Sequence, residues 1–197
     1  MGKIYIITGK SATGKDTLFK KLLENKEINL KTVVMYTTRP IRQEEIEGVE
    51  YHFVNEEGLK QLEKDNKVIE HRSYNTVHGV WHYFTVNDGQ IDLKNYDYLM
   101  LGTVESIIQI GKYYGFDHVE PIYLEVADDE RLFRSIRREQ RQVKPNYAEI
   151  CRRYLADEED FSEENLKKLN LPRRYSNVDI HQCTTELISC IKSFTVK

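Results

Sequence analysis

The sequence predicts an α/β fold, in which a parallel sheet is flanked by helices on both faces and carries a smaller, mixed α/β insertion. Two observations support this prediction. Short apolar runs rich in isoleucine, leucine and valine alternate with helical patterns toward both ends of the chain, as in buried parallel strands. In contrast, residues 37–90 contain adjacent strand-like segments with turn signals, which indicate a separate small sheet. The 197 residues are enough for one domain with such an insertion.

Each element is expected where the residue pattern has the right period. Runs of apolar, β-branched and aromatic residues predict strands at 3–8, 32–36, 51–54, 68–74, 77–86, 96–101, 119–126 and 177–180. Apolar residues at helical spacing predict helices at 15–25, 56–66, 104–114, 128–142, 147–161, 162–169 and 184–194. Gly115 ends the third of these helices, and the turn Asn87-Asp88-Gly89 favours a hairpin.

Composition excludes several classes of protein. The formal net charge of −3 does not indicate a general nucleic-acid-binding surface, and no apolar run approaches the ~20 residues of a membrane span. The first residues lack a signal-peptide pattern. Three widely spaced cysteines form neither a disulfide framework nor a zinc motif, so we expect a cytoplasmic protein. Cys183 and Cys190, seven residues apart, are expected on one buried helix face.

The strongest motif lies between the first expected strand and the first expected helix. Residues 9–15 have the spacing G-x-x-x-x-G-K of a P-loop, in the strand–loop–helix context that the motif requires. Glycines let backbone N–H groups converge on a phosphate, the helix N-terminus adds partial positive charge, and the lysine adds a full charge. This predicts a P-loop NTPase-type sheet, and the candidate ATP-binding residues are Gly9, Ser11, Ala12, Thr13, Gly14, Lys15, Asp16 and Thr17.

The residue after the loop lysine departs from the usual pattern. That position normally holds a serine or threonine whose hydroxyl binds Mg²⁺, whereas here it is Asp16, followed by Thr17. A carboxylate beside a triphosphate is repulsive unless a cation lies between them, so Asp16 and Thr17 are candidate Mg²⁺ ligands. The alternative is that Asp16 only stabilises the first turn of the helix.

A second informative segment covers residues 37–54. Arg39 and Arg42 lie three residues apart beside threonines, and guanidinium groups match the geometry of a phosphate. Tyr51 can donate a third hydrogen bond to the same phosphate. Together with the P-loop upstream, this segment resembles the guanylate kinase family, which has a threonine pair, two arginines, a glutamate, a glycine, a tyrosine and Phe-Val in nearly the same order. The resemblance spans the chain and weakens after about residue 75.

The resemblance implies an acceptor site for GMP. The two arginines and Tyr51 would hold the monophosphate, and Glu70 would read guanine, because its carboxylate accepts from adjacent N–H groups that adenine lacks. Glu45 matches a family glutamate and would pair with an arginine. Either His78 or Tyr83 would replace a family tyrosine. The implied GMP-binding residues are Arg39, Arg42, Glu45, Tyr51, Glu70, His78 and Tyr83.

The chain departs from the family around the nucleobase. The family's aspartates on the strand after the acceptor subdomain are replaced by apolar and small residues at 99–103, and its serine before the threonine pair is replaced by Tyr36. Residues 86–96 are rich in turns where the family has a helix. We therefore expect a divergent base-binding region.

The helix expected at 128–142 is unusually rich in arginine. Residues 131–153 contain seven arginines and one lysine against two glutamates. In nucleoside monophosphate kinases this region is the helical lid that closes over ATP. Similarity implies that Arg134 and Arg138 are the lid pair and that Arg153 reaches the transferred phosphoryl group. Arg137 and Arg141 are the candidates in the alternative register.

The combined expectation is a guanylate kinase-like phosphotransferase that converts ATP and GMP into ADP and GDP with Mg²⁺. Small nucleotides are the expected partners, without nucleic acid or membrane, and the chain is expected to be a monomer or a homodimer. The catalytic residues would be Lys15, Arg39, Arg134, Arg138 and Arg153. The expected organisation is an NMP-binding subdomain at 37–95, a lid at 128–153 and a core formed by 1–36, 96–127 and 154–197.

Two other functions stay open. One is a related kinase whose acceptor is another nucleoside monophosphate or ribose 1,5-bisphosphate, because kinases of that sugar can also carry aspartate after the loop lysine. The other is a non-enzymatic guanylate-kinase-like module that binds peptides. Such modules commonly have degraded P-loops, whereas Lys15 and both loop glycines are intact here.

Overall fold

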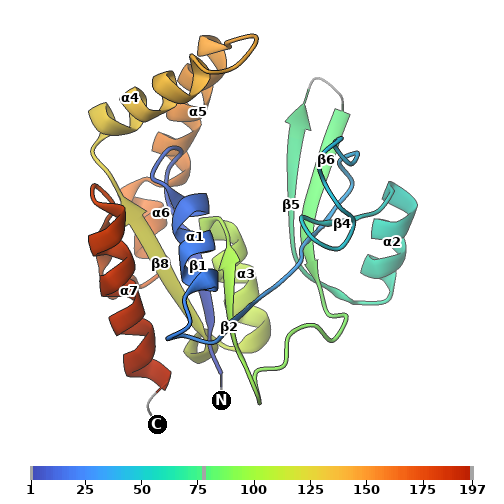
Figure 1. The fold of residues 1–197 in the computed structure, drawn as a ribbon. Coiled ribbons are helices and arrows are strands. Elements are labelled where there is room, and N and C mark those ends of the chain that lie inside the picture. The colour runs from blue at the N-terminus through green and yellow to red at the C-terminus, as the bar shows by residue number, and fades with distance from the viewer. Residues whose placement is uncertain (1, 77–78, 196–197) are drawn as a thin grey trace.

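The computed structural model describes residues 2–76 and 79–195, and its centre is a five-stranded sheet (Figure 1). The order of the strands is β2-β7-β1-β8-β9. All four ladders between them are parallel, as the alternation of strands and helices predicts. The strands are β1 (Ile4–Thr8), β2 (Leu30–Thr32), β7 (Asp97–Leu101), β8 (Val119–Glu125) and β9 (Arg174–Ser176).

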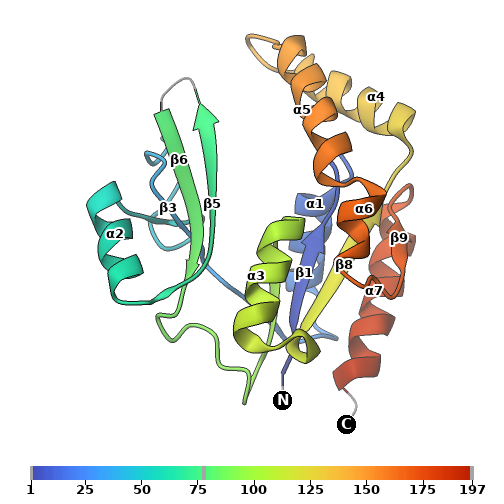
Figure 2. The ribbon, with the colours of Figure 1, turned by 180° about the vertical axis from the view of Figure 1, so that it is seen from behind.

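Helices cover both faces of this sheet. They are α1 (Lys15–Glu24), α3 (Val104–Tyr114), α6 (Glu163–Lys167) and α7 (Ile180–Thr195), and a short 3-10 helix at Phe116–His118 leads into β8. The central strand β1 is apolar on both sides: Ile4 and Ile6 belong to the core with α3 and α6, whereas Tyr5 and Ile7 belong to the core with α1 and α7. Figures 1 and 2 show the two helical layers from opposite sides.

A second, four-stranded sheet lies beside the core (Figure 1), with the order β4-β3-β6-β5. Its strands are β3 (Tyr36–Thr37), β4 (His52–Phe53), β5 (Val68–Thr76) and β6 (Gly79–Val86). β5 and β6 pair antiparallel, whereas β3 and β4 pair parallel. On one face, Phe84 and Val86 pack against Leu59 of α2 (Glu56–Lys64). Because side chains alternate along a strand, Tyr83 and Thr85 occupy the opposite face.

A pair of helices, α4 (Asp128–Glu139) and α5 (Tyr147–Asp160), extends beyond the carboxyl end of β8 (Figure 1). Within these two fully described helices, Arg131 and Ser135 of α4 are buried and no residue of α5 is buried. The α4–α5 pair is therefore attached to the core with little apolar burial.

Two expectations about chain connections are wrong. The strand expected at 32–36 is divided, because β2 and β3 belong to different sheets. The turn Asn87-Asp88-Gly89 closes no hairpin, because β6 leaves the second sheet there and the chain continues to β7 in the first. Gln90 stabilises this crossing: its Oε1 accepts from Val34 N at 2.7 Å and its Nε2 donates to Val34 O at 3.1 Å.

The C-terminal elements also differ from the expected bounds. The last strand lies at Arg174–Ser176 and not at 177–180, and α7 begins at Ile180, four residues early. Asp179 explains the early start, because its Oδ1 accepts from His181 N at 2.7 Å and so caps the helix.

Two expectations drawn from composition agree with the structure. Cys183 is buried and Cys190 partly buried in one apolar cluster, which confirms their shared helix face. None of the helices in the described part of the chain has the length and hydropathy that a membrane-spanning helix requires.

Candidate active site

The P-loop takes its shape from three residues with left-handed backbone conformations. The φ angle is +146° at Gly9, +62° at Ala12 and +89° at Gly14. A Cβ at Gly14 would lie 2.5 Å from Asn177 Nδ2, and one at Gly9 would lie 2.6 Å from Leu124 O, so both positions require glycine. The loop joins β1 to α1, in the position that the sequence predicts (Figure 1).

Lys15 begins α1, and its ammonium group folds back over the loop. Its Nζ donates to the carbonyl oxygens of Gly9 at 2.6 Å and Lys10 at 2.9 Å. Thr13 Oγ1 donates to the same Lys10 carbonyl at 2.8 Å. Burial lowers the pKa of Lys15 below its ordinary value, although the nearby carboxylate of Asp157 opposes the shift. The loop thus carries a desolvated cation, which attracts anions more strongly than an exposed lysine does.

A pocket of about 390 Å³, here called the loop pocket, lies between the P-loop, α4 and the start of α7. Two of the arginines expected in the lid, Arg134 and Arg138, line it together with Lys15. Arg134 is held in place, because its Nη1 donates to Asn177 O at 3.1 Å and its Nε donates to Glu130 Oε1 at 2.8 Å. The remaining lining residues are Ala12, Gly14, Asp16, Thr17, Asn177, Val178 and Ile180.

Asp16 and Thr17 lie exposed on the first turn of α1. No group of three or more histidine, cysteine, aspartate or glutamate side chains among residues 2–76 and 79–195 could hold a metal ion. One carboxylate nevertheless suits Mg²⁺, which usually takes one or two protein carboxylates together with phosphate oxygens and water. The residues present fit a magnesium ion held mainly by phosphates in the loop pocket.

The other arginines expected near the phosphates lie elsewhere. Arg137 and Arg141 are not in the lining of the loop pocket, and neither is Arg153. Arg153 Nε donates to Glu149 Oε1 at 2.8 Å on the same helix. Hydrogen bonds from Arg152 and Arg153 lower the pKa of Glu149 to about 2. The structure therefore brings Arg134 and Arg138 to the P-loop, but not Arg153.

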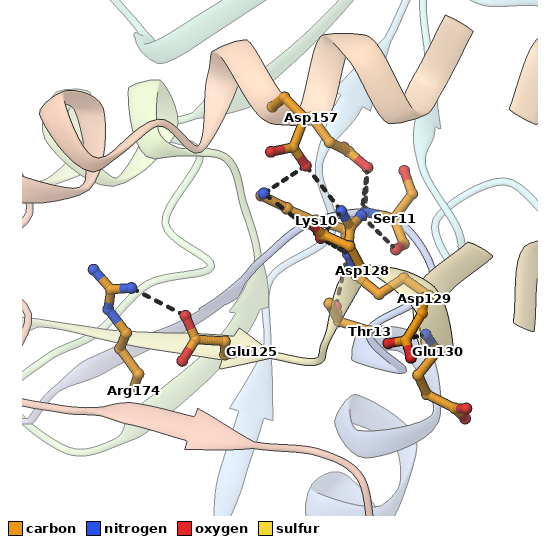
Figure 3. A network of polar contacts seen from close by, with 11 residues as sticks. Lys10, Ser11, Thr13, Glu125, Asp128, Asp129, Glu130, Asp157 and Arg174 are labelled. Atoms are coloured by element: carbon orange, nitrogen blue, oxygen red, sulfur yellow. Dashed lines mark hydrogen bonds and ion pairs between the residues drawn. The ribbon is translucent and has the colours of Figure 1, made fainter. Parts of the chain in front are cut away.

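Arg131 is buried, with 2% of its surface exposed, in an ionic network between the P-loop and the α4–α5 pair. Its guanidinium lies 2.6 Å from Asp128 Oδ1, 3.0 Å from Glu158 Oε1 and 3.4 Å from Asp157 Oδ2. Asp157 Oδ2 also accepts from Ser11 N at 2.7 Å (Figure 3). This arginine is therefore structural, although the sequence groups it with the lid arginines.

A second contact completes this arrangement. Lys10 Nζ donates to Glu158 Oε1 at 2.6 Å, so two consecutive loop residues are bound to two consecutive carboxylates of α5. We call this set the Arg131 network; its members are Lys10, Ser11, Asp128, Arg131, Asp157 and Glu158. Sequence reasoning missed Asp157 and Glu158, because they lie in an acidic run that reads as a solvated helix end.

Sequence reasoning also missed Asn177, which supports the P-loop from the end of β9. Its Nδ2 donates to Thr13 O at 2.7 Å, and only 2% of its surface is exposed. Functional residues of parallel sheets collect just beyond the carboxyl ends of strands. Asn177 directly follows the carboxyl end of β9. It would have been a candidate if the last strand had been predicted at 174–176 instead of 177–180.

On the second sheet, Arg39 is buried and paired with Glu45, as the sequence predicts for that glutamate. The Arg39 guanidinium donates to Glu45 from Nη2 at 2.7 Å and from Nη1 at 3.0 Å. Glu45 Oε2 also accepts from Arg42 N at 2.8 Å, which shapes the loop around the two arginines. The Arg42 side chain is exposed.

Aromatic rings surround Arg39. Its guanidinium carbon lies 5.6 Å from the ring centroid of Tyr51, and the Tyr51 and Tyr83 rings pack edge to face with centroids 5.6 Å apart. Tyr83 therefore lies with the expected phosphate ligands. His78, the other candidate for this position, lies outside the described residues.

Glu70 lies on the same face of the second sheet and is buried. It accepts from Thr85 Oγ1 at 3.0 Å and from Arg72 Nε at 3.0 Å. Arg72, which sequence reasoning missed, lines a cleft of about 610 Å³ between β5, α3 and α6. We call this the acceptor cleft; its lining also includes Thr103, Glu105, Asp160 and Lys168.

Comparison with known proteins agrees with this arrangement. Residues 1–83 match the family model described as guanylate kinase. The guanylate kinase of Neisseria gonorrhoeae is 36% identical over 111 residues, which cover 55% of this chain and 52% of that protein. The guanylate kinase of Mycoplasma mobile is 42% identical over 79 residues, which cover 40% and 39%. The resemblance to the guanylate kinase family is confirmed. The chain spans about half the length of the first of these relatives, and less of the second.

The likeness to guanylate kinases extends to the fold of the whole chain. The crystal structure of guanylate kinase from Anaplasma phagocytophilum superimposes with a TM-score of 0.70 at 21% identity. The superposition covers 100% of this chain and 87% of the Anaplasma phagocytophilum chain. The region matched in sequence, 1–83, contains the P-loop, Arg39, Tyr51 and Glu70, whereas the α4–α5 pair lies outside it.

We predict that Asn177→Ala destabilises the protein by about 1–3 kcal/mol, because the substitution leaves the buried Thr13 carbonyl without its donor. Urea unfolding measures the loss. Asn87→Ala is the matched control, because Asn87 Nδ2 makes an exposed hydrogen bond to Tyr113 at 2.8 Å. Its expected change is within ~0.5 kcal/mol. Equal losses in the two variants would contradict the role given to Asn177.

Proposed function

We propose that this protein is a guanylate kinase, which transfers the γ-phosphoryl group of ATP to GMP and releases ADP and GDP. The observation that carries the proposal is the pairing of an intact P-loop, facing Arg134 and Arg138 in the loop pocket, with an Arg39–Tyr51–Tyr83 cluster on the second sheet. The match of residues 1–83 to the guanylate kinase family model supports it.

On the donor side, the loop N–H groups and Lys15 bind the phosphates of ATP. Asp16 and Thr17 are the residues that would contact Mg²⁺, which neutralises phosphate charge when it is bound. Arg134 and Arg138 line the loop pocket together with Lys15 and stabilise the charge on the transferring group. The proposed lid, residues 128–153, contains α4 and the first half of α5, and it excludes water so that ATP is not hydrolysed.

On the acceptor side, Arg39, Arg42, Tyr51 and Tyr83 bind the GMP phosphate and orient it for in-line attack. Glu70 accepts from the N1–H and the 2-amino group of guanine. No general base is required, because the acceptor phosphate is already largely ionised near pH 7. The second sheet belongs to the proposed NMP-binding subdomain, 37–95, and the five-stranded sheet to the proposed core. The proposed setting is cytoplasmic nucleotide metabolism.

A coupled assay of ADP release tests the proposal. We expect turnover with GMP and dGMP that exceeds turnover with AMP, UMP, CMP and ribose 1,5-bisphosphate. Lys15→Ala is expected to lose at least ~100-fold in rate, because a transition-state cation is removed. The exposed Lys20→Ala on the same helix is the control and is expected to keep the wild-type rate. Lack of turnover with every acceptor would reject the enzyme, and turnover with AMP but not GMP would reject the role of Glu70.

The pH dependence of kcat/KM for ATP gives a second test. That ratio reports groups of the free enzyme, and burial lowers the pKa of Lys15. Raising the pH removes the Lys15 charge, so we expect kcat/KM for ATP to fall with rising pH, earlier than an ordinary lysine would allow. In Lys15→Arg the guanidinium stays charged, and this alkaline fall should be absent. An unchanged alkaline limb in Lys15→Arg would show that another group titrates.

A further inference from the structure

The carboxylate proposed to read guanine already binds a guanidinium group. Arg72 donates to both oxygens of Glu70, from Nε to Oε2 at 3.0 Å and from Nη2 to Oε1 at 3.2 Å. The pair is shielded from water, since the Glu70 side chain is fully buried and that of Arg72 is 10% exposed. Arg72 and Glu70 lie two residues apart on β5 and therefore share one face of the strand.

The two donors of Arg72 reproduce the hydrogen-bonding edge of guanine. In guanine, N1–H and the 2-amino group on C2 present two parallel N–H donors in one plane. A guanidinium presents the same edge through Nε–H and Nη2–H, and it matches a carboxylate in the same forked geometry. Arg72 therefore makes the contact that the proposed function assigns to the base of GMP.

The acceptor capacity of Glu70 does not allow both partners. A carboxylate has about four lone-pair sites, two on each oxygen. Oε1 accepts from Thr85 at 3.0 Å and from Arg72, and Oε2 accepts from Arg72. Guanine needs one site on each oxygen, but Oε1 has none left. Guanine can make both contacts only after Arg72 leaves.

We propose that Arg72 is an intramolecular competitor of guanine at Glu70, and that it sets the base selectivity of the acceptor site. This inference rests on the proposed function. Displacement of Arg72 opposes binding of every acceptor that uses Glu70, so it lowers the affinity for GMP and narrows the preference for GMP over AMP. The displaced guanidinium can turn into the acceptor cleft, whose lining includes the carboxylates of Glu105 and Asp160.

The sulfur of Met35 is a further neighbour of the Arg72 guanidinium. Arg72 Nη2 lies 3.4 Å from Met35 Sδ, which is a weak acceptor. Tyr36 packs on the other face of the sheet, where its ring stacks on Phe84 at 5.6 Å. Tyr36 is therefore not a neighbour of Arg72, and the neighbour on its side of the sheet, Met35, carries no charge that could replace Glu70 as a partner.

The test is Arg72→Ala. We expect KM for GMP to fall about tenfold, because hydrogen bonds to the Glu70 charge no longer have to be broken. KM for IMP, which keeps N1–H but lacks the 2-amino group, should fall less, and KM for AMP should not change. The value of kcat should change little, since Arg72 contacts neither phosphate loop nor lid. A purely structural role would shift all three acceptors alike.

Melting temperatures with and without nucleotide give a second test, which does not depend on enzyme turnover. Removing Arg72 leaves a buried, unpaired carboxylate, which destabilises the fold. GMP supplies the missing donors, so it should raise the melting temperature of Arg72→Ala more than that of the wild type, and AMP should not. Arg72→Gln keeps one amide donor, so GMP should raise its melting temperature by an intermediate amount. This variant replaces Arg72→Ala in the test if the alanine variant does not fold. Arg173→Ala, which removes an exposed pair with Glu186, is the control.

The outcomes separate the two claims. If GMP turnover is absent in the wild type, the proposed function fails, and the melting shifts still decide the role of Arg72. The inference is supported if the gain for GMP disappears in the Glu70→Gln, Arg72→Ala double variant. A KM for GMP that rises in Arg72→Ala would show that Arg72 binds the base instead of competing with it. An unchanged KM, or the absence of any GMP-dependent melting shift in the variants, would also overturn the inference.

Discussion

The buried guanidinium of Arg131 is the interaction on which the geometry of the donor site depends. A buried charge is tolerated only with close partners, and the partners of Arg131 come from its own helix, α4, and from α5. Two of these carboxylates, Asp157 and Glu158, also contact the P-loop through Ser11 N and Lys10 Nζ. One arginine thus fixes the distance between the phosphate-binding loop and both helices of the proposed lid. Because no residue of the fully described helix α5 is buried, this position is set by charge more than by apolar packing.

The acceptor side is organised in the same way. Arg39 is paired with Glu45, and Arg72 with Glu70, each within the second sheet and its loops. A forked pair between arginine and a carboxylate holds both groups in one plane, so the donors are already oriented before any ligand arrives. Such pairs also compete with ligands. An anion that binds Arg39 must displace Glu45, and a group with N–H donors that binds Glu70 must displace Arg72. Under the proposed function, ligand binding in this site would therefore be an exchange of partners.

Features that depend on residues close together in the sequence could be predicted, whereas features that depend on contacts between distant segments could not. The P-loop spacing and the strand–helix alternation are local patterns. The structure has the P-loop and most of the alternating elements where they were expected, apart from the divided strand at 32–36 and the shifted last strand and helix. The Asn87-Asp88-Gly89 turn is local too, but whether it closes a hairpin depends on which sheet accepts the next strand, and that is decided by the pairing of β7 with β1. Asn177 and Asp157 act on the P-loop across 164 and 146 residues, so no local pattern marks them. Arg72 belongs to no recognisable motif either, because its proposed role depends on its contact with Glu70 on the same face of β5.

The basic stretch at 131–153 is followed by an acidic one, since residues 157–164 contain six acids and no base. Two such opposed patches explain how a chain with a net charge of −3 can offer a site for polyanions. Most arginines of the α4–α5 pair have carboxylate partners within the pair: Arg131 has three, Arg134 has Glu130, and Arg152 and Arg153 share Glu149. Free arginines in such a cluster would repel one another and keep the helices apart. Pairing removes that repulsion, but the exposed pairs contribute little stability and are easily exchanged. A triphosphate in the loop pocket offers Arg134 a more highly charged partner than Glu130. Exchange of Glu130 for a phosphate at Arg134 would leave the number of ion pairs nearly unchanged, and it needs no change in the spacing between α4 and the P-loop that the Arg131 network sets.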